Sequence, residues 1–406
     1  MENRVTPRSS EATPCPFDFS EGLDFDPSLA ALMARDSLPL IRLPYGDGDA
    51  WLVTGFDGVR QVTTDPRFSR AGIMGSDYPR LTPEPIVSPE SINVMDPPGS
   101  SRLRHLAAQA FTTRHVDRMR RGIIRLADDL LDEMAAQGPP ADLARQLSNQ
   151  LPQQTIYDVL GIARDNWPRM QRYTHELLAT GPGSRESAAN AKAELRSYFG
   201  ELVEQRRRSP GKDLISALAA AGDGEDALDD GEVAVMALTL VLSGQDTATC
   251  QISNIAYVLL TRPELMRHLR DRPETLTGVL NELLRVIPFR KGVGIPRVAL
   301  EDVELDGVRI RAGDFVHVSY LTANHDPARY ADPHAVDPER TPAPHMTFGW
   351  GGHRCIAVPL AMAELEVAVG RLIERFPGLR LAVPPEEIRW DTDTIRRFPL
   401  ELPVTW

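Results

Sequence analysis

The sequence predicts a mainly α protein, with one mostly helical domain, a long central helix and small β-sheets. Apolar residues recur at three- and four-residue spacing through most of residues 97–208, as in amphipathic helices. Residues 229–260 are apolar around most of the helix circumference, so we expect this helix to be buried. Short segments with β-type patterns and glycine turns lie on both sides of this helical series.

The N-terminal part combines polar segments with short elements. Residues 1–15 are polar and contain Pro and Ser, so we expect a flexible arm before a single domain over residues 16–406. Residues 40–54 predict a β-hairpin and residues 57–64 a short helix. Residues 71–95 are rich in Pro, Gly and Ser and predict a long loop, which in a compact domain is usually functional or disordered.

The helical series leads into the long helix, and β-structure follows it. Asp306-Gly307, in the middle of residues 303–310, indicates a hairpin turn. The apolar spacing predicts helices over residues 97–111, 116–136, 142–160, 167–179, 189–208 and 229–260.

Composition excludes several classes of protein. The 406 residues carry a net charge of −12, which argues against a nucleic-acid binder because such proteins present a basic face. No long apolar segment at the N-terminus predicts a membrane anchor, and no leader peptide precedes the chain, so we expect a cytoplasmic protein. The three cysteines are too few and too scattered for a disulfide framework or a zinc cluster.

One cysteine lies where its chemistry is useful. Cys355 ends a glycine-rich loop and directly precedes an apolar helix that should begin near Pro359. Free N–H groups and the positive end of the helix dipole favour the thiolate form of such a cysteine. Glycines let a bulky partner approach the backbone closely. The loop therefore predicts an anionic sulfur ligand for a metal, beside a pocket for a large flat group, whereas the plainer alternative is a buried free cysteine.

This loop resembles the haem-ligand signature of the cytochrome P450 superfamily, Phe-Gly-x-Gly-x-His-x-Cys-x-(Gly or Ala). The resemblance implies a cytochrome P450 fold of the soluble bacterial type, with haem b as the cofactor and Cys355 as the ligand of its iron. It extends from about residue 20 to Trp406. The residues that match the signature are Phe348, Gly349, Gly351, His353, Cys355 and Ala357.

The central helix contains a polar interruption. Gly244 costs helix stability, which suggests local widening or a close approach by another segment. Asp246 and Thr247 then place an acid and an alcohol side by side. The family carries a Gly-x-(Asp or Glu)-Thr element here, so the resemblance implies that Gly244, Asp246 and Thr247 serve catalysis by relaying protons. Ser243 departs from the usual alanine. A simple polar interruption of a buried helix is the alternative.

The resemblance also implies a structural charge cluster. Glu282 and Arg285 are three residues apart on one helix face, within reach of each other. The family pairs such residues with a later arginine, which is Arg340 here. We expect the three to form a buried, hydrogen-bonded cluster that locks the loop leading to Cys355.

Haem carries two propionates, which need cationic and hydrogen-bonding partners. The Asp-Pro-Pro segment at residues 96–98 resembles a family helix start, and by that match Arg104 faces a propionate. Ser100 stands where the family often has histidine, which puts that contact in doubt. Arg297 and His353 match two further partners. Solvated surface charges are the alternative for each arginine.

Loop and helix positions predict the substrate pocket. The basic segment at residues 289–292 suggests either a contact with a carbonyl or acid of the substrate or, as we expect, a face toward water or a propionate. The expected lining residues are Val87, Asn93, Leu240, Ser243, Val293, Ile295, Ile395 and Arg396.

The resemblance implies a haem-thiolate monooxygenase that activates O₂ to oxidise a small organic substrate in bacterial specialised metabolism. One alternative is oxidative coupling or ring closure of an aromatic or cyclic-peptide substrate at the same haem. A non-catalytic haem sensor or carrier is another, although it would not need Asp246 and Thr247. Since no flavin or nicotinamide module is present, a ferredoxin and its reductase should supply electrons. By family analogy the electron donor would dock near Arg102, Arg114 and Arg354. The alternative is that these arginines form an ordinary solvated surface.

Overall fold

The computed structural model describes residues 12–15, 17, 22–221, 227–341 and 343–406. Helices dominate, which confirms the mainly α prediction. The α-helices are α1 (Pro27–Met33), α2 (Phe56–Thr64), α3 (Gly99–Ala108), α4 (Thr113–Gln137), α5 (Gln150–Leu160), α6 (Trp167–Leu178), α7 (Arg185–Arg208), α8 (Leu214–Ala219), α9 (Asp230–Thr261), α10 (Pro263–Asp271), α11 (Leu276–Val286), α12 (Tyr320–Asn324) and α13 (Val358–Arg375). The strands are β1 (Thr13–Pro14), β2 (Leu40–Arg42), β3 (Ala50–Val53), β4 (Phe68–Ser69), β5 (Ala141–Asp142), β6 (Arg297–Ala299), β7 (Val303–Leu305), β8 (Val308–Ile310), β9 (Phe315–Val318), β10 (Arg380–Leu381) and β11 (Pro403–Thr405).

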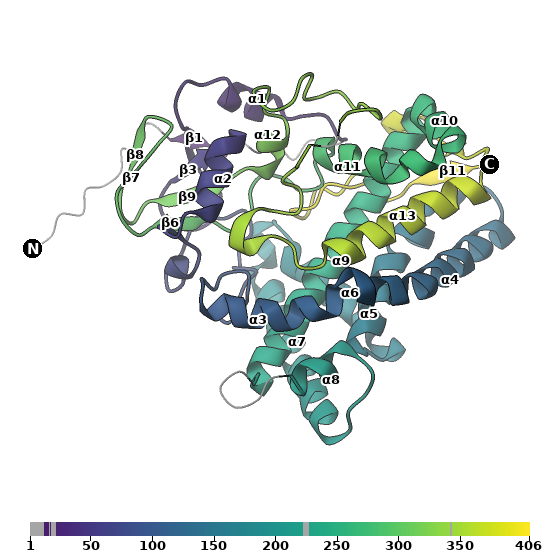
Figure 1. Cartoon of the computed structure of the whole chain (residues 1–406), viewed down its shortest axis with the longest axis horizontal. Coiled ribbons are helices and arrows are strands. Elements are labelled where there is room, and N and C mark those ends of the chain that lie inside the picture. Colours follow the sequence, from purple (N-terminus) through teal and green to yellow (C-terminus); the bar gives the residue numbers. More distant parts are fainter. Residues whose placement is uncertain (1–11, 16, 18–21, 222–226, 342) are drawn as a thin grey trace, which may run out of the picture.

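Helix α9 passes through the middle of the helical part (Figure 1). Its first turn is fixed by a capping box, in which Asp229 and Glu232 satisfy each other's backbone N–H groups. It packs against α5, α7 and α13, and apolar residues around its circumference are buried as predicted. Its length and apolarity would let it cross a membrane, but 78% of its most apolar window lies inside the molecule, as in a core helix.

A six-stranded sheet lies beside α2 and α12, on the side of the molecule away from the C-terminus (Figure 1). Its order is β1-β2-β3-β9-β6-β4. The predicted hairpin at residues 40–54 is confirmed as the antiparallel pair β2–β3, and β7–β8 confirms the second predicted hairpin. Strand β9 joins β3 in parallel and β6 antiparallel, which holds Arg297 opposite Val316 in the interior.

Two local predictions differ from the structure. The helix expected over residues 142–160 begins later, because Asp142 belongs to β5, pairs with Pro403 in β11 and is followed by a π-helical turn at Ala144–Ser148. Of the predicted flexible arm, residues 1–11 lie outside the described part of the chain. Thr13–Pro14 pairs with β2 as strand β1. The division into an arm and a single domain stays a prediction.

The loop before α13 connects the two parts of the fold. Figure 1 shows this yellow-green segment passing between the sheet side and the helices before α13 runs alongside α4. The short 3₁₀ turn at Gly351–His353 in this loop contacts α2. The loop thus lies where segments distant in sequence converge, which is a favourable place for a site.

Candidate active site

The glycine-rich loop presents Cys355 at its end. The Cys355 N–H donates to the Phe348 carbonyl oxygen at 2.8 Å, which closes the loop. Gly351 has a φ of 67°, and a Cβ there would overlap the Thr63 carbonyl oxygen at the end of α2, so only glycine fits. Cys355 is exposed, whereas Cys250 is buried. The alternative of a buried free cysteine is therefore wrong.

Opposing effects act on the pKa of this sulfur. Desolvation by the surrounding protein atoms raises the pKa of the Cys355 thiol, although a backbone hydrogen bond from Ala357 and the charges of Arg104 and Arg354 lower it. The Ala357 N–H next to the start of α13 therefore acts in the predicted direction, but burial outweighs it. A bound metal cation supplies what is lacking, because a coordinating thiol is deprotonated.

Four basic side chains from four parts of the fold gather near this loop. We call Arg70, Arg104, Arg297 and His353 the cationic cluster; they come from the segment after β4, from α3, from β6 and from the loop. Arg297 is 1% exposed, and both terminal nitrogens of its guanidinium lack a hydrogen-bond partner within the described part of the chain, as does Nδ1 of His353. Among the described residues, no ion pair involves Arg70, Arg104 or Arg297.

The electrostatics of the cationic cluster indicate a missing anion. Burial, together with Arg297 and Arg104, lowers the pKa of Arg70 to about 9. Burial and the three arginines lower the pKa of His353 to about 2, so this imidazole is neutral. Buried charges are normally paired. Buried donors without acceptors, beside an exposed cysteine, fit the two propionates and the iron of haem.

Sequence reasoning missed one member of the cationic cluster, Arg70, and a neighbouring hydroxyl, that of Tyr320. Arg70 donates to the Asn93 carbonyl at 2.9 Å and receives support from Asp96, which accepts its backbone N–H at 3.1 Å. The buried Tyr320 hydroxyl, near Arg70, also lacks a partner. No spacing in the sequence relates either residue to Cys355. Ser100 is buried in the first turn of α3, where its backbone N–H donates a hydrogen bond to the Asp96 carbonyl.

The polar residues of α9 point in different directions. Thr247 donates to the Ser243 carbonyl at 2.8 Å, and Ser243 is exposed although its helix is buried. A Cβ on Gly244 would lie 3.0 Å from the Ile156 side chain, so the close approach expected at this glycine is made by α5. No hydrogen bond among the described residues joins Asp246 to Thr247.

The Asp246 carboxylate is buried and faces two arginines. Its Oδ1 lies 3.3 Å from Arg396, and its Oδ2 lies 3.8 Å from Arg290. Burial raises the pKa of Asp246, whereas these two arginines lower it. Arg396 also contacts Asp391 at 3.3 Å and His175 at 2.9 Å. A chain of polar contacts therefore joins the buried acid to an exposed histidine on α6.

A cavity lies between α9, the 71–95 loop and the segment after α11. Val235, Leu238, Thr239, Leu242 and Ser243 form its α9 face, with the spacing of one side of a helix. It also receives predicted lining residues from the loops, together with Tyr78, Arg80 and Leu178, which were not predicted, and Arg290 from the basic segment at residues 289–292. The predicted residues that line it are Val87, Asn93, Ser243, Val293, Ile295 and Ile395.

Two predicted lining residues lie outside this cavity, and the basic segment at residues 289–292 behaves differently from the expectation in part. Leu240 lies two residues from Leu238 on α9, so it faces away and is buried in the core. Arg396 does not line the cavity, because its guanidinium turns to Asp246 and Asp391. Within that segment Lys291 is 3% exposed and donates to the Asp391 carbonyl at 2.8 Å, so it does not face water, whereas Arg290 lines the cavity.

Glu282, Arg285 and Arg340 meet in the interior as a second group of charges. Arg285 donates to both carboxylate oxygens of Glu282 at 2.9 and 2.8 Å, and Arg340 donates to Oε1 at 2.8 Å. Arg285 also reaches the carbonyls of Asn324 and Pro333, at 2.8 and 2.6 Å, in the segment that leads toward the cysteine loop. Although burial raises the pKa of Glu282, the arginines hold it below its ordinary value.

Comparison with known proteins agrees with this geometry. Residues 271–394 match the family model "Cytochrome P450". Nocardicin C N-oxygenase from Nocardia uniformis subsp. tsuyamanensis is 43% identical, with 96% of this chain and 98% of the relative covered. The chain is a cytochrome P450.

Two further proteins that are similar to this cytochrome P450 have names or descriptions that refer to coupling or synthase reactions. Biflaviolin synthase from Streptomyces coelicolor is 41% identical, with 95% of this chain and 94% of the relative covered. The crystal structure of a cytochrome P450 described as having biaryl coupling reactivity is 56% identical and superposes with a TM-score of 0.96, covering 97% of this chain and 100% of that one.

Membership of the family establishes the general activity. This cytochrome P450 binds haem through a cysteine thiolate and is a monooxygenase of bacterial specialised metabolism. It acts on a small molecule with O₂ and electrons from redox partners. The relatives are enzymes, which favours catalysis over the alternative of a haem sensor or carrier.

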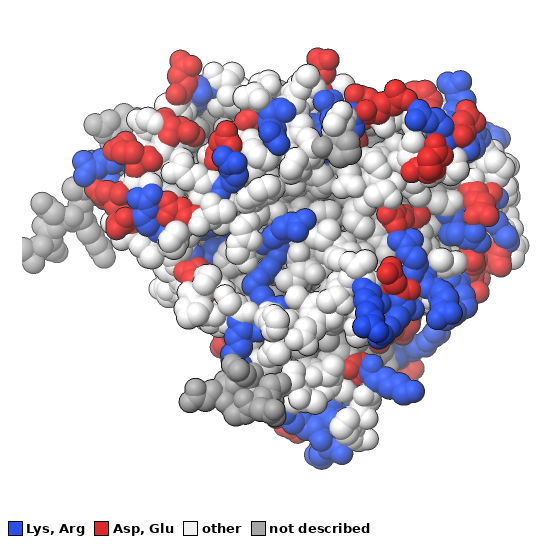
Figure 2. Space-filling view, in the orientation of Figure 1, with Lys and Arg blue, Asp and Glu red and all other residues white. Residues whose placement is uncertain are grey.

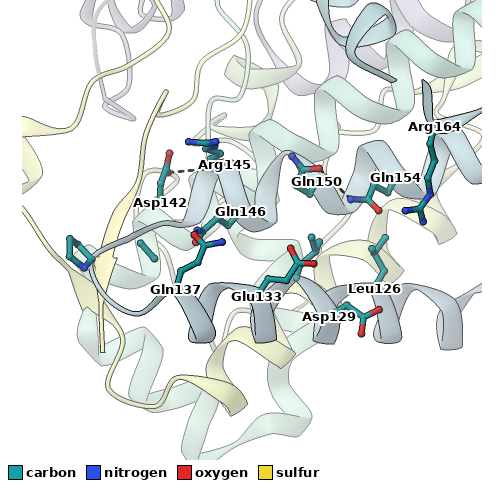
Figure 3. A pocket seen from close by; sticks show the side chains of 13 residues that line it. Leu126, Asp129, Glu133, Gln137, Asp142, Arg145, Gln146, Gln150, Gln154 and Arg164 are labelled. Carbon is teal, nitrogen blue, oxygen red and sulfur yellow. Dashed lines mark hydrogen bonds between the residues drawn. The ribbon is translucent and has the colours of Figure 1, made fainter. Parts of the chain in front are cut away.

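A hollow on another part of this cytochrome P450 is separate from the site. Figure 3 shows it between α4 and the α5 region, where Gln146 donates to Gln137 and Gln154 to Gln150. Asp129 and Glu133 also line it. None of the predicted site residues lies in this hollow.

Proposed function

We propose that Cys355 ligates the haem iron and that the cationic cluster, with the Tyr320 hydroxyl, receives the two propionates. The observation that carries this assignment is the set of buried, unpartnered donors on Arg297 and His353 beside the exposed cysteine. Phe348, Gly349 and Gly351 shape the loop, and Ser100 is buried in the first turn of α3. Thiolate-bound haem supplies the activation of O₂.

The residues of α9 would then position the substrate and move protons. Ser243 lines the substrate cavity, and Thr247 lies one turn further along the same helix. We assign to Asp246 the uptake of a proton from the Arg396 and His175 side and to the Thr247 hydroxyl its delivery toward the reacting centre. Gly244 keeps α9 and α5 close together at this point.

A ferredoxin and its reductase are the proposed electron donors, in the cytoplasm. Figure 2 shows Lys and Arg side chains gathered over the region where Figure 1 places α3 and α4. Arg114 and Arg354 are exposed and free to meet an acidic partner, in line with the sequence hypothesis. Arg102 contributes less, because it forms an ion pair with Glu232.

Oxidative coupling of an aromatic substrate is a second candidate for the reaction. The 56%-identical crystal structure is described as having biaryl coupling reactivity, and a 41%-identical relative is named biflaviolin synthase. Coupling joins two substrate molecules without inserting oxygen, whereas the monooxygenase reaction adds an oxygen atom from O₂. Both need the same haem-thiolate centre.

The ligand assignment is tested with two cysteine variants. Cys355→Ala should abolish the thiolate-type absorption of the ferrous carbon monoxide complex, because it removes the proposed sulfur ligand. Cys250→Ala removes a thiol buried in α9 and should leave this spectrum in place. An unchanged spectrum in the Cys355 variant would exclude the assignment.

The reaction type is tested by labelling. The reconstituted enzyme is supplied with ¹⁸O₂ and 2-naphthol as a probe, and the products are analysed by mass spectrometry. Monooxygenation gives a naphthol carrying one labelled oxygen. A dimeric product without label establishes coupling instead.

A further inference from the structure

Arg290 lies on the border between the substrate cavity and the buried acid of α9. Its side chain lines the cavity, is 35% exposed, and lies 3.8 Å from Asp246 Oδ2. No hydrogen bond of its guanidinium occurs among the described residues. A guanidinium has several donors in a fixed fork, so Arg290 has unused capacity on the side of the cavity.

The backbone fixes where Arg290 stands. It pairs with Arg396 in an antiparallel bridge, and the flanking Lys291 N–H donates to the Ile395 carbonyl at 2.9 Å. Arg396 is held more firmly than Arg290, since it also contacts Thr394, Asp391 and His175. Besides the Asp246 contact, the Arg290 guanidinium lies over the Phe289 ring, 5.8 Å from its centroid. Asp246 therefore faces one arginine held by several further polar contacts and one whose other contact is with an aromatic ring.

The cavity itself has a positive lining. Arg80 and Arg290 are its charged side chains, and no carboxylate belongs to the described residues that line it. Arg80 is already engaged, by an ion pair with Asp77 and by hydrogen bonds to the carbonyls of Tyr78 and Pro83 at 3.1 and 2.9 Å. Arg290 is thus the cation of this lining that a ligand would meet.

We propose that a negatively charged oxygen of the substrate, a carboxylate or a phenolate, binds Arg290 and draws its guanidinium away from Asp246. Arg290 is then both the residue that selects acidic substrates and a positioning residue for the acid on α9. Asp246 is released for proton transfer when a substrate is in place. This inference rests on the proposed role of Asp246 as the proton-relaying acid.

The electrostatic consequence has a definite sign. The groups that face Asp246 are Arg396, Arg290 and Asp391, with Cys250 one turn along the same helix. Burial raises the pKa of Asp246 and the two arginines oppose this effect. Neutralising Arg290 with a substrate anion removes part of the opposition, so the protonated carboxyl becomes more favoured. The acid then holds a proton that it can donate.

Selectivity is tested first, by calorimetric titration of the haem-loaded enzyme with 2-naphthoate and with the neutral 2-naphthamide. We expect the anion to bind about tenfold more tightly or better, because a charge-assisted contact replaces a neutral one. Arg290→Gln should remove this preference, and Arg290→Lys should keep part of it. If Arg290→Gln retains the full preference for naphthoate, the proposal is wrong.

The link to Asp246 is tested by infrared difference spectroscopy across pH. Binding of naphthoate should raise the apparent pKa of a carboxyl band that is missing in Asp246→Asn. Naphthamide should not shift the band, and Arg290→Gln should show the raised value without ligand. A band that ignores naphthoate overturns the link. Neither experiment depends on product identity, so a coupling result with ¹⁸O₂ leaves this inference standing, and the reverse holds as well.

Discussion

Two groups of buried arginines in this cytochrome P450 differ in what faces them. Arg285 meets both oxygens of Glu282 and backbone carbonyls, so its charge and donors are satisfied within the chain. Arg297, which is equally buried, ends in two nitrogens without partners and lies near Arg70 and Arg104. The first group is complete, whereas the second carries like charges close together.

This difference in partners distinguishes arginines that stabilise the fold from arginines that are available to bind a ligand. A buried charge without a partner costs free energy, so a protein keeps one only where something else gains from it. The complete group stabilises the segment leading to the cysteine loop. The incomplete cationic cluster is arranged for an anion that arrives with the cofactor. Replacing an arginine of the first group should therefore lower the stability of the protein, whereas replacing one of the cationic cluster should leave it unchanged or raise it.

The largest effect is expected in the complete group. Arg285→Met leaves Glu282 buried with only Arg340 beside it, and should lower the free energy of unfolding by about 3–5 kcal/mol. Arg375→Met breaks an exposed ion pair with Asp132 and should cost less than about 1 kcal/mol. Urea unfolding measures both. Equal losses in the two variants would remove the distinction between the groups.

A smaller and opposite effect is expected in the cationic cluster. Arg297→Met removes like-charge repulsion, so the haem-free protein should keep its stability or gain slightly. Loss of a charge-assisted contact to a propionate should speed haem release by about tenfold. Haem transfer to apomyoglobin and urea unfolding of the haem-free protein check the two parts. Arg309→Met, at an exposed ion pair, is the control. Destabilisation as large as that of Arg285→Met would contradict the comparison.

At pH 7 the smallest effect concerns the buried histidines around both groups, because it develops only as the pH falls. Burial lowers the pKa of His317, His325 and His345 to about 4, from an ordinary value of 6.5. The unfolded chain then binds more protons between these values, so stability falls as pH drops below 6.5. His317→Gln should reduce the slope of this loss by about 1.4 kcal/mol per pH unit, measured by urea unfolding at several pH values. An unchanged slope would mean that His317 is not buried as a neutral side chain.

Local patterns predicted much of the fold and the outline of the site. The spacing of apolar residues located α9, and the glycine-rich loop located Cys355 with its neighbour His353. The direction in which each side chain points was harder to predict from the sequence. Leu240 was assigned to the cavity although a helix turns it away from Leu238, and Arg396 was assigned there although its loop directs it to Asp246.

By itself, the sequence determined the elements that depend on neighbouring residues: helix periodicity, capping, turns and the glycine loop before α13. Only the tertiary structure decided which charges find partners. Arg70 came into the cationic cluster, Tyr320 came to lie beside it, and Arg290 came to face Asp246, because segments far apart in the chain pack together. The physical reason is that helix and turn preferences act over a few residues, whereas burial and charge pairing depend on everything that packs around a side chain.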